Sequence, residues 1–317
     1  MSGDRHSPYN AVFPTPYKNG SRMTLNIDGT LPSPPQRPTD AHKGTFGRVL
    51  IIAGSRGMSG AAVLSGLGAL RGGAGLVYLA VPKSVQPLVA SAEPSYLVHP
   101  VGEDVTGGIS GDAVSKLEQL AGQMSAVAVG PGMGNANELP ELIEQIYARV
   151  SQPIVVDADG LNALANLGPA WHRIRPAGPR ILTPHPGEFA RLLKTTIAEV
   201  QANRSSLAAE FAAKHNVILL LKGAGTVITD GTRLAINQTG NPGMATGGSG
   251  DVLTGLIVAL LAQGMPPFEA ARLGAHLHGL AGDLAAADLS QPGLIASDLP
   301  RYLAKAWLKH QSETTAP

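Results

Sequence analysis

Short apolar runs that end in glycine recur along this chain from Gly47 onward, and stretches with helical spacing lie between them. The run "RVLIIAG" at 48–54 is rich in β-branched residues and closes on a glycine, as a buried parallel strand does. Residues 59–75 then carry alanine and leucine at helical spacing, and "LVYLAVP" at 76–82 predicts the next strand. This alternation predicts an α/β fold: a three-layer sandwich with a mostly parallel central sheet and helices on both faces.

The same pattern continues along the chain in five more segments, at 126–134, 153–164, 181–193, 217–231 and 251–264. Within them, "TVITDGTRLAIN" at 226–237 sets Asp-Gly between two apolar runs and predicts an antiparallel hairpin.

Residues 1–40 differ from the rest of the chain, because they hold seven prolines and little apolar periodicity. They predict a loosely ordered arm, either a disordered tail or an arm that packs on a neighbouring subunit. We expect residues 41–310 to form one domain.

The composition of the chain limits the classes of protein and of partner that fit it. Of the 317 residues, 44% are hydrophobic and 15% are charged, so the chain can bury a large core. The net charge of +1 offers no basic field for nucleic acid or an anionic membrane, and we expect neither as a partner. The chain has no cysteine, which excludes disulfides, thiolate metal sites and a cysteine nucleophile. Without an apolar signal segment or a transmembrane span, we expect a cytoplasmic protein.

The predicted strands end in residues suited to ligand binding. In folds of this class, ligands bind beyond the carboxyl ends of the strands. Here those ends read "AGS", "GPGMG", "DADGLN", "TPHPGE", "KGAGT" and "GGSGD". The convergence of glycine, aspartate, histidine and asparagine at one edge of a sheet predicts an active cleft there.

The segment "NPGMATGGSGDVLTG" at 241–255 combines five glycines with a single acid, Asp251. Gly247, Gly248 and Gly250 permit a tight turn whose N–H groups point inward, a nest for anionic oxygens. The apolar run that follows predicts a buried helix, and its N-terminus favours the same anions. Asp251 is either a helix cap or a general base. A carboxylate beside phosphate is repelled, so a base that takes a proton from an attacking hydroxyl explains its place better.

"KGAGT" at 222–226 follows another predicted strand. Gly223 and Gly225 again free backbone N–H groups, while Lys222 and Thr226 add a cation and a hydroxyl. Lys222 is otherwise an ordinary charge at a strand edge. The chain contains neither a Walker P-loop nor the full G-x-G-x-x-G fingerprint of dinucleotide-binding folds, so a nucleotide would bind by another route.

Two further motifs carry acids and histidines. Asp157 and Asp159 are two apart at a strand end and could hold Mg²⁺ directly or through water, although Asp159 also suits a helix cap. His185 lies between two prolines in "TPHPGE", which favours a substrate contact over a core histidine. His276 and His278 are two apart in a predicted helix and face different ways, so we expect no metal site there.

In order along the chain, seven blocks resemble the ADP/ATP-dependent NAD(P)H-hydrate dehydratase family. These blocks are "HKGTFGRVLIIAGS", "SGAAVLSGLGALRGGAGLV", "VGPGMG", "DADGLNAL", "LTPHPGE", "KGAGTVI" and "NPGMATGGSGDVLTG". They span about residues 42–290. The resemblance implies a ribokinase-like α/β sandwich whose glycine-flanked aspartate is catalytic. Many relatives carry an amino-terminal epimerase domain; with only its 40-residue arm in that place, the chain resembles the stand-alone dehydratase.

The resemblance also implies a reaction and a role for each motif. The implied substrate is the (6S) hydrate of NADH or NADPH (NADHX or NADPHX), whose ring hydroxyl receives a phosphoryl group from ADP or ATP. Elimination of phosphate then restores NAD(P)H, with Mg²⁺ among the donor phosphates. Asp251 is the implied catalytic base, and the implied nucleotide-binding residues are Lys222, Gly223, Ala224, Gly225, Thr226, Gly248, Ser249 and Gly250. Ser249 stands where many members have threonine, and both supply a hydroxyl. The implied substrate contacts are Ala61, Gly132, Gly134, His185 and Asp251.

Relatives further suggest a homotetramer and a functional partnership with a separate NAD(P)HX epimerase. The choice between ADP and ATP stays open, although bacterial and archaeal members generally favour ADP. Two alternatives remain. One is another ribokinase-like kinase, acting on a thiamine precursor or vitamin alcohol, which shares "GGSGD" but not the neighbouring blocks. The other is a nucleotide-binding sensor without turnover.

Overall fold

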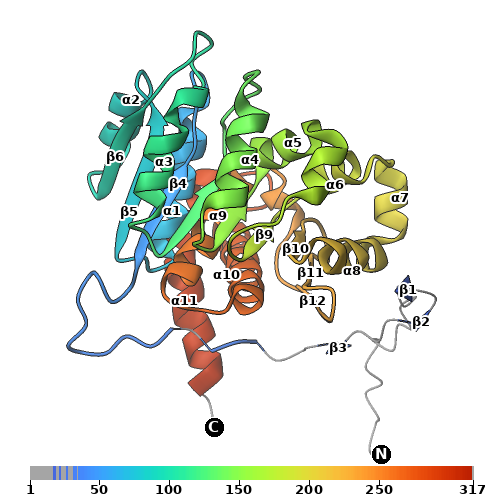
Figure 1. Cartoon of the computed structure of the whole chain (residues 1–317). Coiled ribbons are helices and arrows are strands. Elements are labelled where there is room, and N and C mark those ends of the chain that lie inside the picture. The colour runs from blue at the N-terminus through green and yellow to red at the C-terminus, as the bar shows by residue number, and fades with distance from the viewer. Residues whose placement is uncertain (1–16, 19–20, 23–25, 28–30, 34, 316–317) are drawn as a thin grey trace, which may run out of the picture.

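A ten-stranded sheet forms the centre of the molecule (Figure 1). The computed structural model describes residues 17–18, 21–22, 26–27, 31–33 and 35–315. The strand order is β3-β12-β11-β10-β9-β8-β7-β4-β5-β6. The pairs from β10 to β6 are all parallel, whereas β11 is antiparallel to both of its neighbours. The strands are β3 (Asn26–Ile27), β4 (Arg48–Ile52), β5 (Leu76–Pro82), β6 (Tyr96–Val101), β7 (Ala126–Val129), β8 (Ile154–Val156), β9 (Arg180–Leu182), β10 (Ile218–Leu221), β11 (Val227–Thr229) and β12 (Arg233–Ile236).

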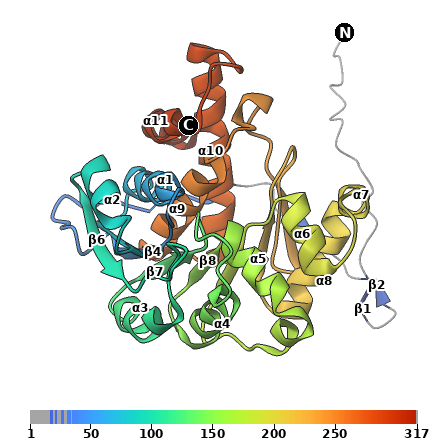
Figure 2. The same cartoon turned by 90° about the horizontal axis from the view of Figure 1, so that it is seen from above.

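The strand residues alternate between two buried cores. In β4, Val49 and Ile51 face one core, while Leu50 and Ile52 face the other. The first core is covered by α1 (Ser59–Arg71), α2 (Gln86–Ala92), α9 (Ser249–Ala262), α10 (Pro267–Leu289) and α11 (Leu299–Thr315). The second is covered by α3 (Val114–Ala121), α4 (Leu139–Arg149), α5 (Ala158–Asn166), α6 (Pro186–Leu193), α7 (Ile197–Ala202) and α8 (Arg204–His215). Figure 2 shows helices on opposite sides of the sheet, so the predicted three-layer α/β sandwich is confirmed.

Several predicted elements are confirmed, and the strand at 76–82 has its predicted boundaries. The strand at 76–82 is β5, and the hairpin at 226–237 is the antiparallel pair of β11 and β12. The buried helix after the glycine-rich loop is α9, most of whose side chains are buried. The helix predicted over 59–75 ends earlier, at Arg71. Gly73 has a φ of +93°, and a Cβ at Gly75 would lie 1.7 Å from the carbonyl oxygen of Lys43, so this stretch turns back toward the next strand.

The predicted arm at 1–40 lies largely outside the described residues. Of its described parts, β1 (Tyr17–Lys18) pairs antiparallel with β2 (Ser21–Arg22), and β3 pairs with β12 at the edge of the sheet. Arg37 donates to the carbonyl oxygen of Gly73 at 2.6 Å and lies 3.9 Å from the centre of the Phe46 ring. None of the helices within the described ranges has the length and hydrophobicity that a membrane crossing requires.

Candidate active site

The first turn of α9 lies where the carboxyl ends of the central strands meet. Gly248 precedes the helix in a left-handed conformation with φ of +96°, which only glycine adopts without strain. A Cβ at this position would also lie 2.4 Å from Leu64 Cδ1, so α1 closes the space beside it. The N–H of Ser249 donates to the carbonyl oxygen of Thr246 at 3.4 Å, whereas the N–H groups of Gly248 and Gly250 have no partner among the described residues. Unpaired N–H groups at a helix start make a site for anionic oxygens. We call Gly248, Ser249 and Gly250 the anion cradle.

Asp251 follows the anion cradle in the first turn of α9. Burial, and after it the negative charge of Asp157, raise the pKa of its carboxyl to about 7, although the positive charge of Lys222 partly opposes them. A carboxyl with a pKa near neutrality is half ionised at the working pH, and its conjugate base is far stronger than that of an exposed aspartate. Asp251 therefore has the properties of a general base.

Lys222 follows β10 and sits between two acids. Its Nζ lies 2.7 Å from Asp157 Oδ1 and 3.8 Å from Glu188 Oε2. Burial alone would lower the pKa of this amine, but the charges of Asp157 and Glu188 raise it above its ordinary value. Lys222 thus stays protonated. A Cβ at Gly250 would lie 3.3 Å from Lys222 Nζ, so the lysine adjoins the anion cradle.

The loop from Gly223 to Thr226 continues from this lysine. Gly223 and Gly225 have φ of +133° and +63°, and the Thr226 hydroxyl donates to the carbonyl oxygen of Gly223 at 2.9 Å. Arg204, the first residue of α8, donates from Nη2 to the carbonyl oxygens of Leu221 at 2.9 Å and of Lys222 at 3.3 Å. Arg204 thus fixes the start of the loop through its backbone, while Gly223, Ala224 and Gly225 remain exposed. The structure thus brings the predicted nucleotide-binding residues of both loops together.

Asp157 and Asp159 point to different partners. Asp157 Oδ1 accepts from Lys222 and Oδ2 accepts from the Thr254 hydroxyl, each at 2.7 Å. Asp159 Oδ2 accepts from the backbone N–H of Gly134 at 2.8 Å. Both oxygens of Asp157 thus accept from side chains of this chain, and one of those donors is a cation, which disfavours a metal ion bound directly to the same carboxylate. Across the described part of the chain, no group of three or more histidine, aspartate or glutamate residues is arranged to hold a metal.

His185 precedes α6 and caps its first turn. Its Nδ1 accepts from the N–H groups of Gly187 at 3.0 Å and Glu188 at 3.3 Å, while the Glu188 side chain accepts from the His185 N–H at 2.7 Å. Burial and then the charge of Lys222 lower the pKa of the imidazole. Since Nδ1 accepts, the proton of the neutral ring is on Nε2. Half of the side chain is exposed, so His185 is not a core histidine.

Ala61, Gly132 and Gly134 form a separate patch with the loop after β4. A Cβ at Gly132 would lie 2.7 Å from the Cβ of Ala61, and one at Gly134 would lie 3.5 Å from Met58 Cε. The hydroxyl of Ser55 donates to the carbonyl oxygen of Gly132 at 2.9 Å. Three of the five residues predicted to contact substrate are therefore neighbours, and Asp159 links Gly134 to the strand end that bears Asp157.

The comparisons with known proteins agree on one family. A family model described as NAD(P)H-hydrate dehydratase matches residues 49–305. An ADP-dependent (S)-NAD(P)H-hydrate dehydratase of Neisseria meningitidis is 34% identical, and the match covers 95% of this chain and 98% of that protein. This chain belongs to the NAD(P)H-hydrate dehydratase family. The resemblance inferred from the sequence is confirmed.

Two further relatives of this family extend the comparison. The crystal structure of an ADP/ATP-dependent NAD(P)H-hydrate dehydratase from Bacillus subtilis, co-crystallized with ATP/Mg²⁺, has a TM-score of 0.75 and 34% identity. That match covers 87% of this chain and 94% of the other. A bifunctional NAD(P)H-hydrate repair enzyme of Moorella thermoacetica is 46% identical over 85% of this chain, which spans 51% of that enzyme. This chain thus spans about half the length of the bifunctional members.

The sequence did not predict the roles of four residues around the candidate site: Glu188 as the cap partner of His185, Arg204, Thr254 and His278. His278 is buried, and its Nε2 lies 2.9 Å from the carbonyl oxygen of Ser249. Because a carbonyl only accepts, Nε2 donates, and α10 thereby holds the first turn of α9. The sequence marked His278 only as an unsuitable metal ligand. Nothing in its local spacing indicates a contact with a helix 29 residues away.

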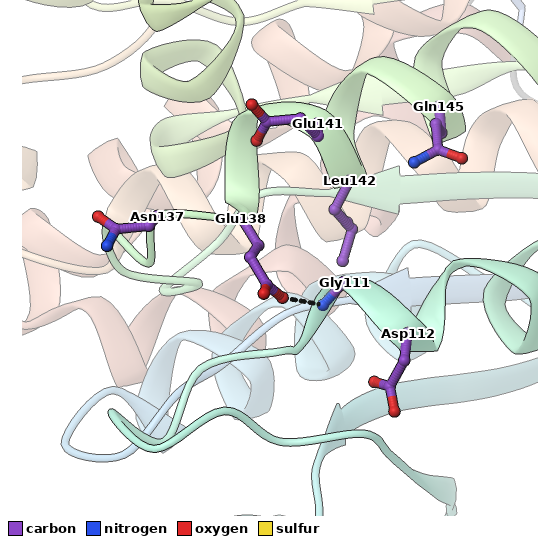
Figure 3. Close-up of a pocket in the computed structure, with 7 residues that line it drawn as sticks. All are labelled: Gly111, Asp112, Asn137, Glu138, Glu141, Leu142 and Gln145. Carbon is purple, nitrogen blue, oxygen red and sulfur yellow. Dashed lines mark hydrogen bonds between the residues drawn. The ribbon is translucent and has the colours of Figure 1, made fainter.

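A hollow in the surface lies elsewhere (Figure 3). Its volume is about 390 Å³, and its lining consists of Gly111, Asp112, Asn137, Glu138, Glu141, Leu142 and Gln145. Glu138 points across it and accepts from the N–H of Gly111 at 2.7 Å. This lining includes none of the predicted site residues and carries several acids, so we do not assign the nucleotide or the hydrate to it.

Proposed function

We propose that this chain catalyses the dehydration of the (6S) hydrate of NADH and NADPH, with ADP or ATP as phosphoryl donor. The observation that carries the proposal is Asp251: a carboxyl with a pKa near 7 next to an anion cradle and a protonated lysine. Such a set deprotonates a hydroxyl while it holds the phosphates that the hydroxyl attacks. The family membership supplies the hydroxyl, that of the hydrated nicotinamide ring.

The proposed reaction has two stages. Asp251 takes the proton of the ring hydroxyl, whose oxygen attacks the terminal phosphorus of the donor as the bond to AMP or ADP breaks. The N–H groups of Gly248, Ser249 and Gly250 stabilise the negative charge on the transferred phosphoryl group. The ring phosphoester then loses phosphate, and an adjacent ring carbon loses a proton, so that the double bond of NAD(P)H forms. Water leaves poorly from the hydrate, whereas phosphate leaves well.

Each predicted binding residue has a part in this proposal. Lys222 and the loop from Gly223 to Thr226 hold the AMP part of the donor, together with Ser249 and Gly250. Ala61, Gly132, Gly134 and His185 contact the hydrate. Mg²⁺ bound among the donor phosphates would neutralise part of their charge. Phosphate oxygens would supply most of its ligands, because Asp157 is paired with the Lys222 cation and Asp159 accepts from the N–H of Gly134.

Finer features belong to the same proposal. We propose a cytoplasmic homotetramer in which residues 41–310 form the catalytic domain and residues 1–40 form an arm. Relatives about twice as long are named bifunctional NAD(P)H-hydrate repair enzymes. We also propose that a separate NAD(P)HX epimerase works alongside this chain. Light scattering on the purified protein measures the subunit number directly.

Product analysis tests the activity. The purified chain is incubated with NADHX and Mg²⁺, with ADP or ATP added in turn, while NADH absorbance and free phosphate are followed together. We expect both to rise in equal amounts and to depend on nucleotide. A stable phosphoester without NADH would instead indicate a small-molecule kinase. Binding of ADP with no hydrate-dependent phosphate release would indicate a nucleotide sensor.

A further inference from the structure

The carboxylate of Asp157 is buried, and both of its oxygens accept hydrogen bonds, although it lies at the edge of the active site. Its relative exposure is 1%, and each oxygen has one short partner: Lys222 Nζ on Oδ1 and the Thr254 hydroxyl on Oδ2, both at 2.7 Å. Both partners donate. An acid that only capped α5 would use backbone N–H groups of that helix, and the Asp157 side chain makes no such bond.

The two partners come from the two halves of the proposed site. Lys222 begins the loop that holds the nucleotide donor, whereas Thr254 lies on α9, three residues after Asp251. Residues three apart on a helix share a face, so Thr254 lies one turn behind the base. One carboxylate therefore joins the donor loop to the helix that carries the base, across sequence separations of 65 and 97 residues.

We propose that Asp157 is a positioning residue that sets Lys222 and the first turns of α9 at a fixed distance, so that the donor phosphates and Asp251 meet in register. The proposal deepens the proposed function, since it rests on Asp251 as the base. It replaces a role for Asp157 as a direct metal ligand. Ala158 has a left-handed φ of +49°, and the Asp157 and Asp159 side chains on either side of it have separate partners.

The charge of Asp157 matters as well as its shape. Lys222 is protonated next to Asp157 and Glu188. Asp157 is the nearer acid: Lys222 Nζ lies 2.7 Å from its carboxylate and 3.8 Å from that of Glu188. Asp157→Asn removes the nearer of the two acids and leaves Glu188, at 3.8 Å, as the acid that faces Lys222. Asparagine at 157 retains the shape and can still accept from Thr254, but it no longer holds the lysine by charge. Valine at 254 removes only the hydroxyl that joins α9 to the carboxylate.

Three single variants and one double variant separate these roles. Asp157→Asn breaks the ion pair, Thr254→Val breaks the bond to α9, and Thr254→Ser keeps the hydroxyl. Thr229→Val is the control, because Thr229 is also a buried threonine: its hydroxyl donates to the carbonyl oxygen of Arg233 at 2.7 Å and accepts from the N–H of Gly231 at 3.0 Å in the hairpin. For each protein we would measure kcat, the Kd of ADP without hydrate, the Mg²⁺ concentration for half-maximal rate, and Tm.

We expect Asp157→Asn and Thr254→Val each to lower kcat by about 10- to 100-fold, as loss of a supporting partner does. We also expect both to weaken ADP binding, although Thr254 belongs to the catalytic helix. The Asp157→Asn/Thr254→Val double variant should lose little more than the worse single one, because one carboxylate carries both contacts. Thr254→Ser should recover most of the rate, Thr229→Val should keep kcat and Kd, and the Mg²⁺ requirement should not move.

Two results would overturn the proposal. One is an Asp157→Asn protein that needs much more Mg²⁺ while Thr254→Val behaves as the wild type, which indicates a metal ligand. The other is additive losses in the double variant, which indicate two unrelated contacts. The ADP measurements need no hydrate, so they test Asp157 even if the wild type does not convert NADHX. A wild type that binds ADP but makes no NADH refutes the proposed function. In that case the Kd values of ADP for the wild type and the variants decide whether Asp157 is a positioning residue. If Asp157→Asn does not fold, the contrast between Thr254→Val and Thr254→Ser decides.

Discussion

Asp251 meets two opposing requirements at the scale of a single residue. The N–H groups of a helix start favour a negative charge, as does the nearby Lys222. Burial and the charge of Asp157 favour the neutral acid, and they prevail, so the pKa of Asp251 is raised to about 7. An exposed aspartate would be ionised at neutral pH but too weak a base to assist the attack of a hydroxyl. The surroundings of Asp251 thus improve it as a base at the pH at which it works.

The pH dependence of the rate follows from this pKa. Only the ionised form of Asp251 accepts a proton, so kcat/KM should rise with pH through a midpoint near 7 and then level off. An unperturbed aspartate, with its ordinary pKa of 3.8, would put the midpoint about three pH units lower. The measurement is kcat/KM for NADHX between pH 5 and 9 at saturating nucleotide. A flat profile over that range would show that Asp251 does not limit the rate as a base.

At the scale of elements, the anion cradle depends on how α9 begins. Gly248 combines a φ of +96° with a close approach of Leu64 Cδ1. Its neighbour Gly247 has no positive φ, and a Cβ added there would meet none of the described atoms within 4 Å. The two glycines are adjacent in sequence but differ in what they demand. They therefore form a matched pair for substitution.

We expect Gly248→Ala to lower the free energy of unfolding by about 1–2 kcal/mol through the left-handed backbone alone, with more from contact with Leu64. It should also weaken ADP binding, because the N–H groups of the cradle move. Gly247→Ala should change the unfolding free energy by less than about 1 kcal/mol. Denaturant unfolding and ADP titration of both variants supply the comparison. Equal effects of the two substitutions would contradict the geometry given for Gly248.

At the scale of the whole molecule, two histidines make stability depend on pH: His278, which is buried, and His215, which is partly buried. Burial lowers the pKa of His278 to about 4 and that of His215 to about 4, from an ordinary value of 6.5. Below pH 6.5 these histidines are protonated in the unfolded chain but stay neutral in the folded chain. The free energy of unfolding therefore falls as the pH is lowered to about 4. The raised pKa of Asp251 acts in the opposite direction between pH 3.8 and about 7. The histidine contribution therefore has to be isolated.

His278→Gln isolates it, because the glutamine amide can still donate to the Ser249 carbonyl but does not titrate. Asp251 is present in both proteins, so its contribution largely cancels in the difference. We expect the variant to gain stability relative to the wild type as the pH falls from 7 to 5. Denaturant unfolding at both pH values measures this. A stability difference that does not change with pH would show that His278 titrates normally in the folded protein.

The sequence predicted the layers and the ends of the strands, because both depend on local patterns. Alternation of short apolar runs predicted the parallel sheet, and glycine-rich strand ends predicted where the site lies. What it did not predict are the contacts between those ends. Lys222 and Asp157 are 65 residues apart, and which strand ends adjoin depends on strand order, which no local pattern encodes. Arg204 and His278 act through backbone carbonyl oxygens, which are present at every position and so give no sequence signal.

The predicted substrate came from the family resemblance and not from the local chemistry of the residues. Glycine loops and one acid indicate phosphoryl transfer, but many small molecules carry a hydroxyl that such a site could phosphorylate. Through the family they resemble, the neighbouring blocks, from "SGAAVLSG" to "KGAGTVI", narrowed the predicted substrate to a hydrated nicotinamide cofactor. The structure then places those blocks around one edge of the sheet, where Ala61 and Gly132 lie in contact.

The most direct test of the account is the rate of Asp251→Asn with NADHX, ADP or ATP, and Mg²⁺. Asparagine has nearly the same shape and leaves the anion cradle in place, but it cannot take the hydroxyl proton. We predict that kcat falls by about 100-fold or more, while ADP still binds. A rate close to that of the wild type would contradict the assignment of Asp251 as the base.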